Sequence, residues 1–130
     1  MLNELTAFLQ TQHDIRLAIL FGSAASNRLR FESDIDLAVQ CDAPLTAARK
    51  MELIEHVVLI SGRPVDLIDL KTIGQPLLGY ILQGKRLKGS SEALAKLAYR
   101  NLIEQADFLP LIERTLAQRR RAWLQSSDAH

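Results

Sequence analysis

Two acidic patterns are the residues of this chain whose types and spacing could do chemistry. Asp34 and Asp36 lie two apart in a strand-like run, and a second such run, residues 65–70, carries Asp66 and Asp69. Side chains two apart on a strand project from the same face. Aspartate is depleted in strands, and carboxylates gathered in a partly buried site repel one another. The pattern therefore indicates a bound cation, and a divalent metal is the expected one.

The second acidic run can add one carboxylate to this face. Asp66 and Asp69 have opposite strand parity, so only one of them can point the same way as Asp34 and Asp36. Asp66 lies inside the run and Asp69 near its end, so Asp66 is the expected third member. Three carboxylates suit a pair of Mg²⁺ ions, which prefer oxygen ligands and bind substrate phosphates. Two such ions can clamp the attacking and leaving oxygens of an in-line displacement at phosphorus.

A glycine–serine pair upstream supplies the other half of such a site. Gly22 and Ser23 follow an apolar run and precede a short predicted helix. Glycine lets a phosphate approach the backbone, and a helix N-terminus aims free N–H groups at it. Together with the carboxylates, the pair predicts phosphoryl or nucleotidyl transfer from a nucleoside triphosphate. The structural alternative is that Asp34 and Asp36 only cap a strand or form ion pairs at its edge.

The elements that must position these residues alternate between helix and strand. Residues 17–21 are continuously apolar, as in a buried strand, and Thr46 and Gly62 are suited to begin and end a helix. Pro110 should break or kink the C-terminal helical pattern. We predict an α/β fold with a small mixed sheet flanked by helices and a helical C-terminal tail. The expected order is helix 3–12, strand 17–21, helix 24–30, strand 34–40, helix 46–60, strand 65–70, helix 76–83, edge strand 85–87 and helical residues 91–124.

Bulk properties indicate one globular domain, with a core over residues 1–90 and a helical extension over 91–130. No apolar run approaches the ~18 residues of a membrane span, so no membrane partner is expected. The single cysteine, Cys41, gives no disulfide framework, and a cytoplasmic location is expected. Residues 1–84 carry a net charge of −3 and residues 85–130 carry +4. The basic extension with Trp123 either packs on the core or binds a partner, and no direct nucleic-acid binding is expected.

These residues resemble a known family. Gly22-Ser23, ten residues, then Asp34-Ile35-Asp36 looks like the motif of DNA polymerase β-type nucleotidyltransferases. The short chain with Asp66 is similar to the minimal nucleotidyltransferase (MNT) branch, and in particular to MntA-like antitoxins of HEPN/MNT toxin–antitoxin pairs. The resemblance implies that Asp34, Asp36 and Asp66 bind Mg²⁺, that Asp66 helps to activate the attacking hydroxyl, and that Gly22 and Ser23 hold the β- and γ-phosphates of ATP.

The resemblance also implies a reaction and a partner. It points to a type VII-like antitoxin that moves AMP from ATP to a tyrosine of a cognate HEPN RNase toxin and so neutralises it. Many relatives carry glycine where this chain has Asn27, and asparagine tolerates left-handed backbone. Two alternatives are a small-molecule (aminoglycoside-like) nucleotidyltransferase, which generally needs a further substrate domain, and a non-catalytic antitoxin that neutralises by binding alone.

Overall fold

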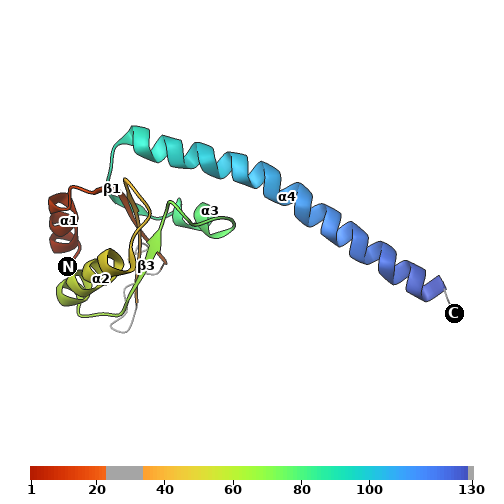
Figure 1. The fold of residues 1–130 in the computed structure, drawn as a ribbon, viewed down its shortest axis with the longest axis horizontal. Helices are drawn as coiled ribbons and strands as arrows, with labels where there is room; N and C mark the ends of the chain where they lie inside the picture. The colour runs from red at the N-terminus through yellow and green to blue at the C-terminus, as the bar shows by residue number, and fades with distance from the viewer. Residues whose placement is uncertain (23–33, 129–130) are drawn as a thin grey trace.

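The computed structural model describes residues 1–22 and 34–128, without the side chains of 108–112 and 125–128. Helices and strands alternate as the sequence predicts, so the predicted α/β order is confirmed over these residues (Figure 1). The predicted helix 24–30 lies outside the described residues. The elements are α1 (Leu2–Thr11), β1 (Ile15–Phe21), β2 (Ile35–Cys41), α2 (Ala47–Ser61), β3 (Val65–Asp69), α3 (Leu77–Ile81), β4 (Lys85–Lys88) and α4 (Ser91–Asp128).

The four strands form one mixed sheet in the order β3-β2-β1-β4. β1 is antiparallel to both β2 and β4, whereas β2 and β3 are parallel. A parallel pair needs a crossover connection, and α2 supplies it between β2 and β3. The predicted caps of this helix are confirmed. The Thr46 side chain accepts a hydrogen bond from the Arg49 N–H at 3.1 Å, and Gly62 ends the helix with φ 66°.

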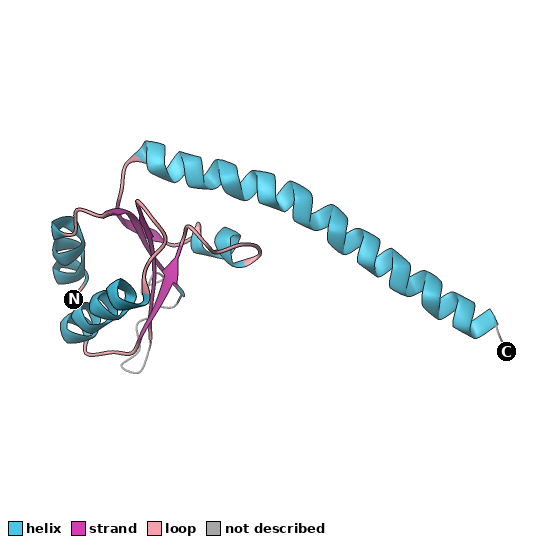
Figure 2. Cartoon of the chain, viewed as in Figure 1, coloured by secondary structure: helices cyan, strands magenta, loops and turns pink. Residues whose placement is uncertain are grey.

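The sheet is covered on both faces, and each face has its own apolar core. One core joins the sheet to α1 and α2, and the other joins it to α3 and the first turns of α4 (Figure 2). Ile35, Leu37 and Val39 of β2 point into the first core, and Ala38 points into the second. The central strand β1 is buried on both sides, which explains why residues 17–21 are apolar without a break.

The C-terminal helix α4 is continuous from Ser91 to Asp128. Leu94 and Leu97 near its start pack on the second core, and its C-terminal part extends away from the sheet (Figure 1). Of the predicted break or kink at Pro110, the break is wrong, and the ribbon curves gently along its length (Figure 1). A proline in a helix interior removes one hydrogen bond and favours a bend. The hydrogen-bonded turns on both sides of residue 110 are enough to keep one helix.

An arginine on α2 ties together the segments that flank the first core. Arg49 donates to both carboxylate oxygens of Asp14, at 2.7 and 3.0 Å, and to Gln12 and Glu52 at 2.8 and 2.9 Å. The Arg49 side chain is only 21% exposed. The hydrogen bond from Arg49 lowers the pKa of Asp14. The ionised carboxylate is therefore stabilised by folding.

We predict that Arg49→Met lowers the free energy of unfolding at neutral pH by about 1 kcal/mol, a small figure because Asp14 is 44% exposed and partly screened. Since the folded pKa of Asp14 is depressed, this contribution is present above the ordinary carboxyl pKa and is lost as the pH falls through the lowered value. Urea unfolding at neutral pH and at about pH 3 measures both effects.

Lys96→Met is the matched control, because Lys96 pairs with Glu92 at 3.4 Å and both side chains are 78% exposed. We expect no measurable change in stability for this variant. A loss as large for Lys96→Met as for Arg49→Met would contradict the account.

Candidate active site

Two of the predicted carboxylates lie side by side on neighbouring strands. Asp36 of β2 is the direct partner of Asp66 in the parallel β2–β3 pairing. Because side chains alternate along a strand, both carboxylates lie on the sheet face that carries Ala38 and Ile68. This is the face covered by α3 and α4. Asp36 is half-buried and Asp66 is exposed.

The third carboxylate, Asp34, lies one residue before β2 and is exposed. It lies near enough to act electrostatically on Asp36. Burial raises the pKa of Asp36 above its ordinary value, and the charges of Asp66 and then Asp34 raise it further. The three groups thus form one cluster of negative charge, centred on the carboxylate with the least access to water.

Gly22 places the end of β1 against this cluster. The preceding residue, Phe21, is the strand partner of Asp36. Gly22 itself has φ 72°, a backbone conformation that favours glycine. A Cβ atom built on Gly22 would collide with Oδ2 of Asp36. The backbone of residue 22 and the Asp36 carboxylate can lie this close only because residue 22 has no side chain.

The remaining predicted residues fall into two groups. Some lie outside the described residues, and others have a different role in the fold. Ser23 and Asn27 lie outside the described residues. Asp69 has the opposite parity to Asp66 and serves the neighbouring loops: its two carboxylate oxygens accept hydrogen bonds from the Leu45 and Lys71 N–H groups, both at 2.9 Å.

The donor chemistry of the cluster fits magnesium. Carboxylate oxygens are the ligands that Mg²⁺ prefers, and the mutual repulsion at Asp36 is what a cation would relieve. Within residues 1–22 and 34–128, no group of three acidic, histidine or cysteine side chains lies close enough together to hold a metal ion by itself. Mg²⁺ does not need one, since it keeps waters and takes substrate phosphates as further ligands.

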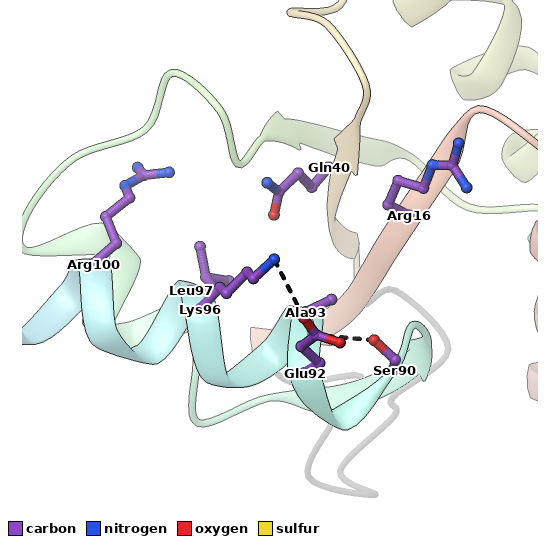
Figure 3. Close-up of a pocket in the computed structure, with 8 residues that line it drawn as sticks. All are labelled: Arg16, Gln40, Ser90, Glu92, Ala93, Lys96, Leu97 and Arg100. Atoms are coloured by element: carbon purple, nitrogen blue, oxygen red, sulfur yellow. Dashed lines mark hydrogen bonds and ion pairs between the residues drawn. The ribbon is translucent and has the colours of Figure 1, made fainter.

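A cavity of about 330 Å³ lies on the same sheet face, near the other end of β2 (Figure 3). Gln40, at this cavity, is four residues from Asp36, roughly 13 Å along a strand. Two basic side chains at this cavity are already engaged. Lys96 pairs with Glu92, and Arg100 donates hydrogen bonds to the carbonyl of Leu70 at 2.5 Å and to the carbonyl of Ile73. The cavity therefore marks the junction of α4 with the sheet and not the carboxylate cluster.

An aromatic pair that the sequence did not single out lies beside the cluster. The rings of Phe21 and Tyr80 meet edge to face, with centroids 6.0 Å apart. The only sequence signal is a tyrosine in a short helix otherwise made of apolar residues and glycine, because the contact itself is tertiary.

A mixed sheet with carboxylates on two parallel neighbouring strands, beside a positive-φ glycine, is an arrangement suited to nucleotidyl transfer. The family profile described as polymerase beta, nucleotidyltransferase, matches residues 3–93. The chain therefore belongs to the polymerase β nucleotidyltransferase family, a family of enzymes. The match covers the whole sheet and every predicted site residue.

Individual relatives agree with this assignment. A Methanocaldococcus jannaschii protein named "Putative protein adenylyltransferase MJ1379" is 37% identical over 70 residues, which are 52% of this chain and 70% of the relative. A crystal structure described as a toxin–antitoxin with AMP-PNP is 25% identical over 88% of this chain and 98% of the matched chain, with a TM-score of 0.75.

Two further crystal structures share the fold. A mutant of the toxin–antitoxin MntA–HpeT has 26% identity and a TM-score of 0.72 over 88% of this chain and 96% of the other. A Shewanella oneidensis structure, described as a tri-AMPylated HEPN toxin in complex with MNT antitoxin, has 24% identity and a TM-score of 0.66 over 88% and 95%. In the part of the chain that the structure describes, no helix has the length and apolar character needed to cross a bilayer.

We predict that Gly22→Ala abolishes nucleotide-dependent activity, because its methyl group must displace the Asp36 carboxylate. Gly62→Ala is the matched control. Gly62 has a nearly equal φ of 66°, but a Cβ atom there meets nothing within 4 Å. Both variants should lose about 1 kcal/mol of stability from the strained backbone, whereas only Gly22→Ala should lose activity. Melting curves and a transfer assay separate the two effects, and equal activity losses would contradict the role of Gly22.

We predict that Asp36→Asn raises the melting temperature near neutral pH by about 2 °C, which corresponds to about 0.5 kcal/mol for a domain of this size. The folded pKa of Asp36 is raised, so its ionised form costs stability above that value and costs nothing below the ordinary carboxyl pKa. The difference from the parent should therefore vanish at about pH 3. Millimolar MgCl₂ should stabilise the parent and not the variant.

Asp42→Asn provides a control of opposite sign, because a hydrogen bond from Arg16 lowers the pKa of Asp42. Its removal should leave the melting temperature unchanged or slightly lower at neutral pH. A rise for both variants would indicate a general effect of net charge in place of local repulsion.

Proposed function

We propose that this protein is a Mg²⁺-dependent nucleotidyltransferase that moves AMP from ATP to a tyrosine of a HEPN-type RNase toxin and so acts as a type VII-like antitoxin. The carboxylate cluster against Gly22 carries the proposal, inside a chain that belongs to the nucleotidyltransferase family. Supporting similarities are the M. jannaschii relative, named for protein adenylylation, and the toxin–antitoxin structure with AMP-PNP. We propose the cytoplasm as its compartment, because Cys41 is a free cysteine.

In this proposal Asp34, Asp36 and Asp66 hold the Mg²⁺ ions, which would neutralise the triphosphate and the developing charge. Gly22 and Ser23 receive the β- and γ-phosphates. The tyrosine oxygen attacks the α-phosphorus, the bond from that phosphorus to the bridging oxygen breaks, and pyrophosphate leaves. Asp66 is exposed and accepts the phenol proton as the new oxygen–phosphorus bond forms.

We also propose a division of roles along the chain, with residues 1–90 as the transferase core and residues 91–130 as an extension that contributes to toxin binding. Leu116, Trp123 and Leu124 of α4 are about half to two-thirds exposed. This surface favours a second candidate, an antitoxin that neutralises by binding alone. The two functions differ in whether neutralisation needs the carboxylates.

Incubation with α-labelled ATP, MgCl₂ and the candidate HEPN toxin tests the proposal. We expect label on the toxin, released pyrophosphate, and a loss of transfer of at least about 100-fold in Asp36→Ala, because the charge-balancing ligand is gone. EDTA should have the same effect. Asp42→Asn, at the other end of β2, should transfer at the parent rate.

The toxin's RNase activity is measured in parallel with the label. Inhibition that appears only with ATP, and that Asp36→Ala loses, supports the transferase. Full inhibition by an Asp34→Ala/Asp36→Ala variant, with no label transferred by the parent, would establish the binding antitoxin and overturn the proposal.

A further inference from the structure

One aromatic side chain on the carboxylate face of the sheet is left open to solvent. Tyr80 of α3 is 53% exposed, although its ring covers Phe21, which is 5% exposed. The edge-to-face geometry has an interplanar angle of 88°, so Tyr80 does not stack flat on its neighbour. One ring of this pair is thus buried as support, and the other remains available to a planar ligand.

The strand register fixes where this ring lies relative to the carboxylates. Phe21 is paired with Asp36, and the next residue, Gly22, lies against the Asp36 carboxylate. Tyr80 is thus linked to the carboxylates by successive neighbours: its ring contacts Phe21, Phe21 is paired with Asp36, and Asp36 is paired with Asp66. In a nucleotide whose phosphates lie at the carboxylates, the base is one ribose away from the phosphates. It then lies either on the side of Phe21 or on the side of β3. Among the described residues on these two sides, Tyr80 supplies an exposed aromatic ring.

The helix that carries Tyr80 is held firmly on both of its other sides. Leu78 and Ile81 are fully buried in the second core. Gly79 faces α4, where a Cβ atom would lie 3.5 Å from Asn101 and 3.6 Å from Gln105. The side chain of Gln75, just before α3, also donates a hydrogen bond to Asn101. α3 lies between the sheet and α4 (Figure 1), so the helix that carries the ring packs against both of them.

We propose that Tyr80 is the stacking surface for the nucleobase of the triphosphate bound at Asp34, Asp36 and Asp66, an inference that rests on the proposed function. Stacking on an aromatic ring strengthens binding about 5- to 150-fold per base and tolerates different bases, since every base has a π-face. Stacking contacts the flat face of a base and not its hydrogen-bonding edge. The site therefore accepts purine nucleoside triphosphates as a class, ATP and GTP alike, and binds the smaller pyrimidine rings less tightly.

The test compares binding of Mg²⁺–ATP with binding of Mg²⁺–tripolyphosphate, which has the phosphates and no base. Calorimetry on Tyr80→Ala should show ATP affinity reduced by about 5- to 150-fold, with tripolyphosphate affinity unchanged. Tyr80→Phe keeps the ring and should bind ATP within about twofold of the parent. In steady-state kinetics Tyr80→Ala should raise KM with little change in kcat, as expected for lost uniform binding.

Two controls make the result specific. Tyr99→Ala removes the other tyrosine of the chain, which is 67% exposed on α4, and should change neither affinity. Tyr80→Leu keeps an apolar cover over Phe21 without an aromatic face, so it should fold like the parent and still lose ATP affinity. Melting temperatures of all four variants identify any loss that comes from folding.

The inference is overturned if Tyr80→Leu and Tyr80→Ala bind ATP like the parent, or if ATP and tripolyphosphate lose affinity equally. A loss in Tyr80→Phe as large as in Tyr80→Ala would also overturn it, because the hydroxyl and not the ring would then be the contact. Failure of the proposed function looks different. In that case the parent transfers no label to the toxin, whether or not its ATP affinity depends on Tyr80.

Discussion

The repulsion between Asp36 and Asp66 is the constraint on which the rest of this structure depends. The parallel pairing of β2 with β3 sets the two carboxylates opposite each other, and Asp34 adds to the negative charge from just before β2. Such a cluster is unfavourable in the protein alone. The fold must therefore hold β2 and β3 in register despite this repulsion. It does so with the capped crossover helix α2, and with alternate β2 side chains buried in the first core.

Strand directions gather the site at one end of the sheet. β1 is antiparallel to β2, so the end of β1 at Gly22 meets the beginning of β2, and the beginning of β3 lies alongside because β2 and β3 are parallel. The same directions place Gln40 and the cavity near the start of α4 at the opposite end. The carboxylates and the attachment of α4 thus occupy different ends of one face.

Local patterns in the sequence predicted most of the fold and the common sheet face of Asp36 and Asp66. Strand alternation was enough to place Asp36 and Asp66 on one face, and cap residues such as Thr46 and Gly62 were enough to bound α2, because these signals act within a few residues. The prediction of a break at Pro110 is wrong because the loss of one backbone hydrogen-bond donor does not end a helix whose turns on both sides are hydrogen-bonded. The contact of Tyr80 with Phe21 joins residues 59 apart, and no local pattern encodes it.

The two faces of the sheet carry different kinds of side chain. The face under α1 and α2 is almost wholly apolar and is reinforced by Arg49, which joins Asp14, Glu52 and Gln12. The opposite face carries the carboxylates and the exposed ring of Tyr80 beside a smaller apolar core. A site that holds repelling charges and open aromatic surface lowers the stability of its own face. Because the stabilising contacts lie across the sheet, they offset that cost without occupying the surface where a nucleotide would bind.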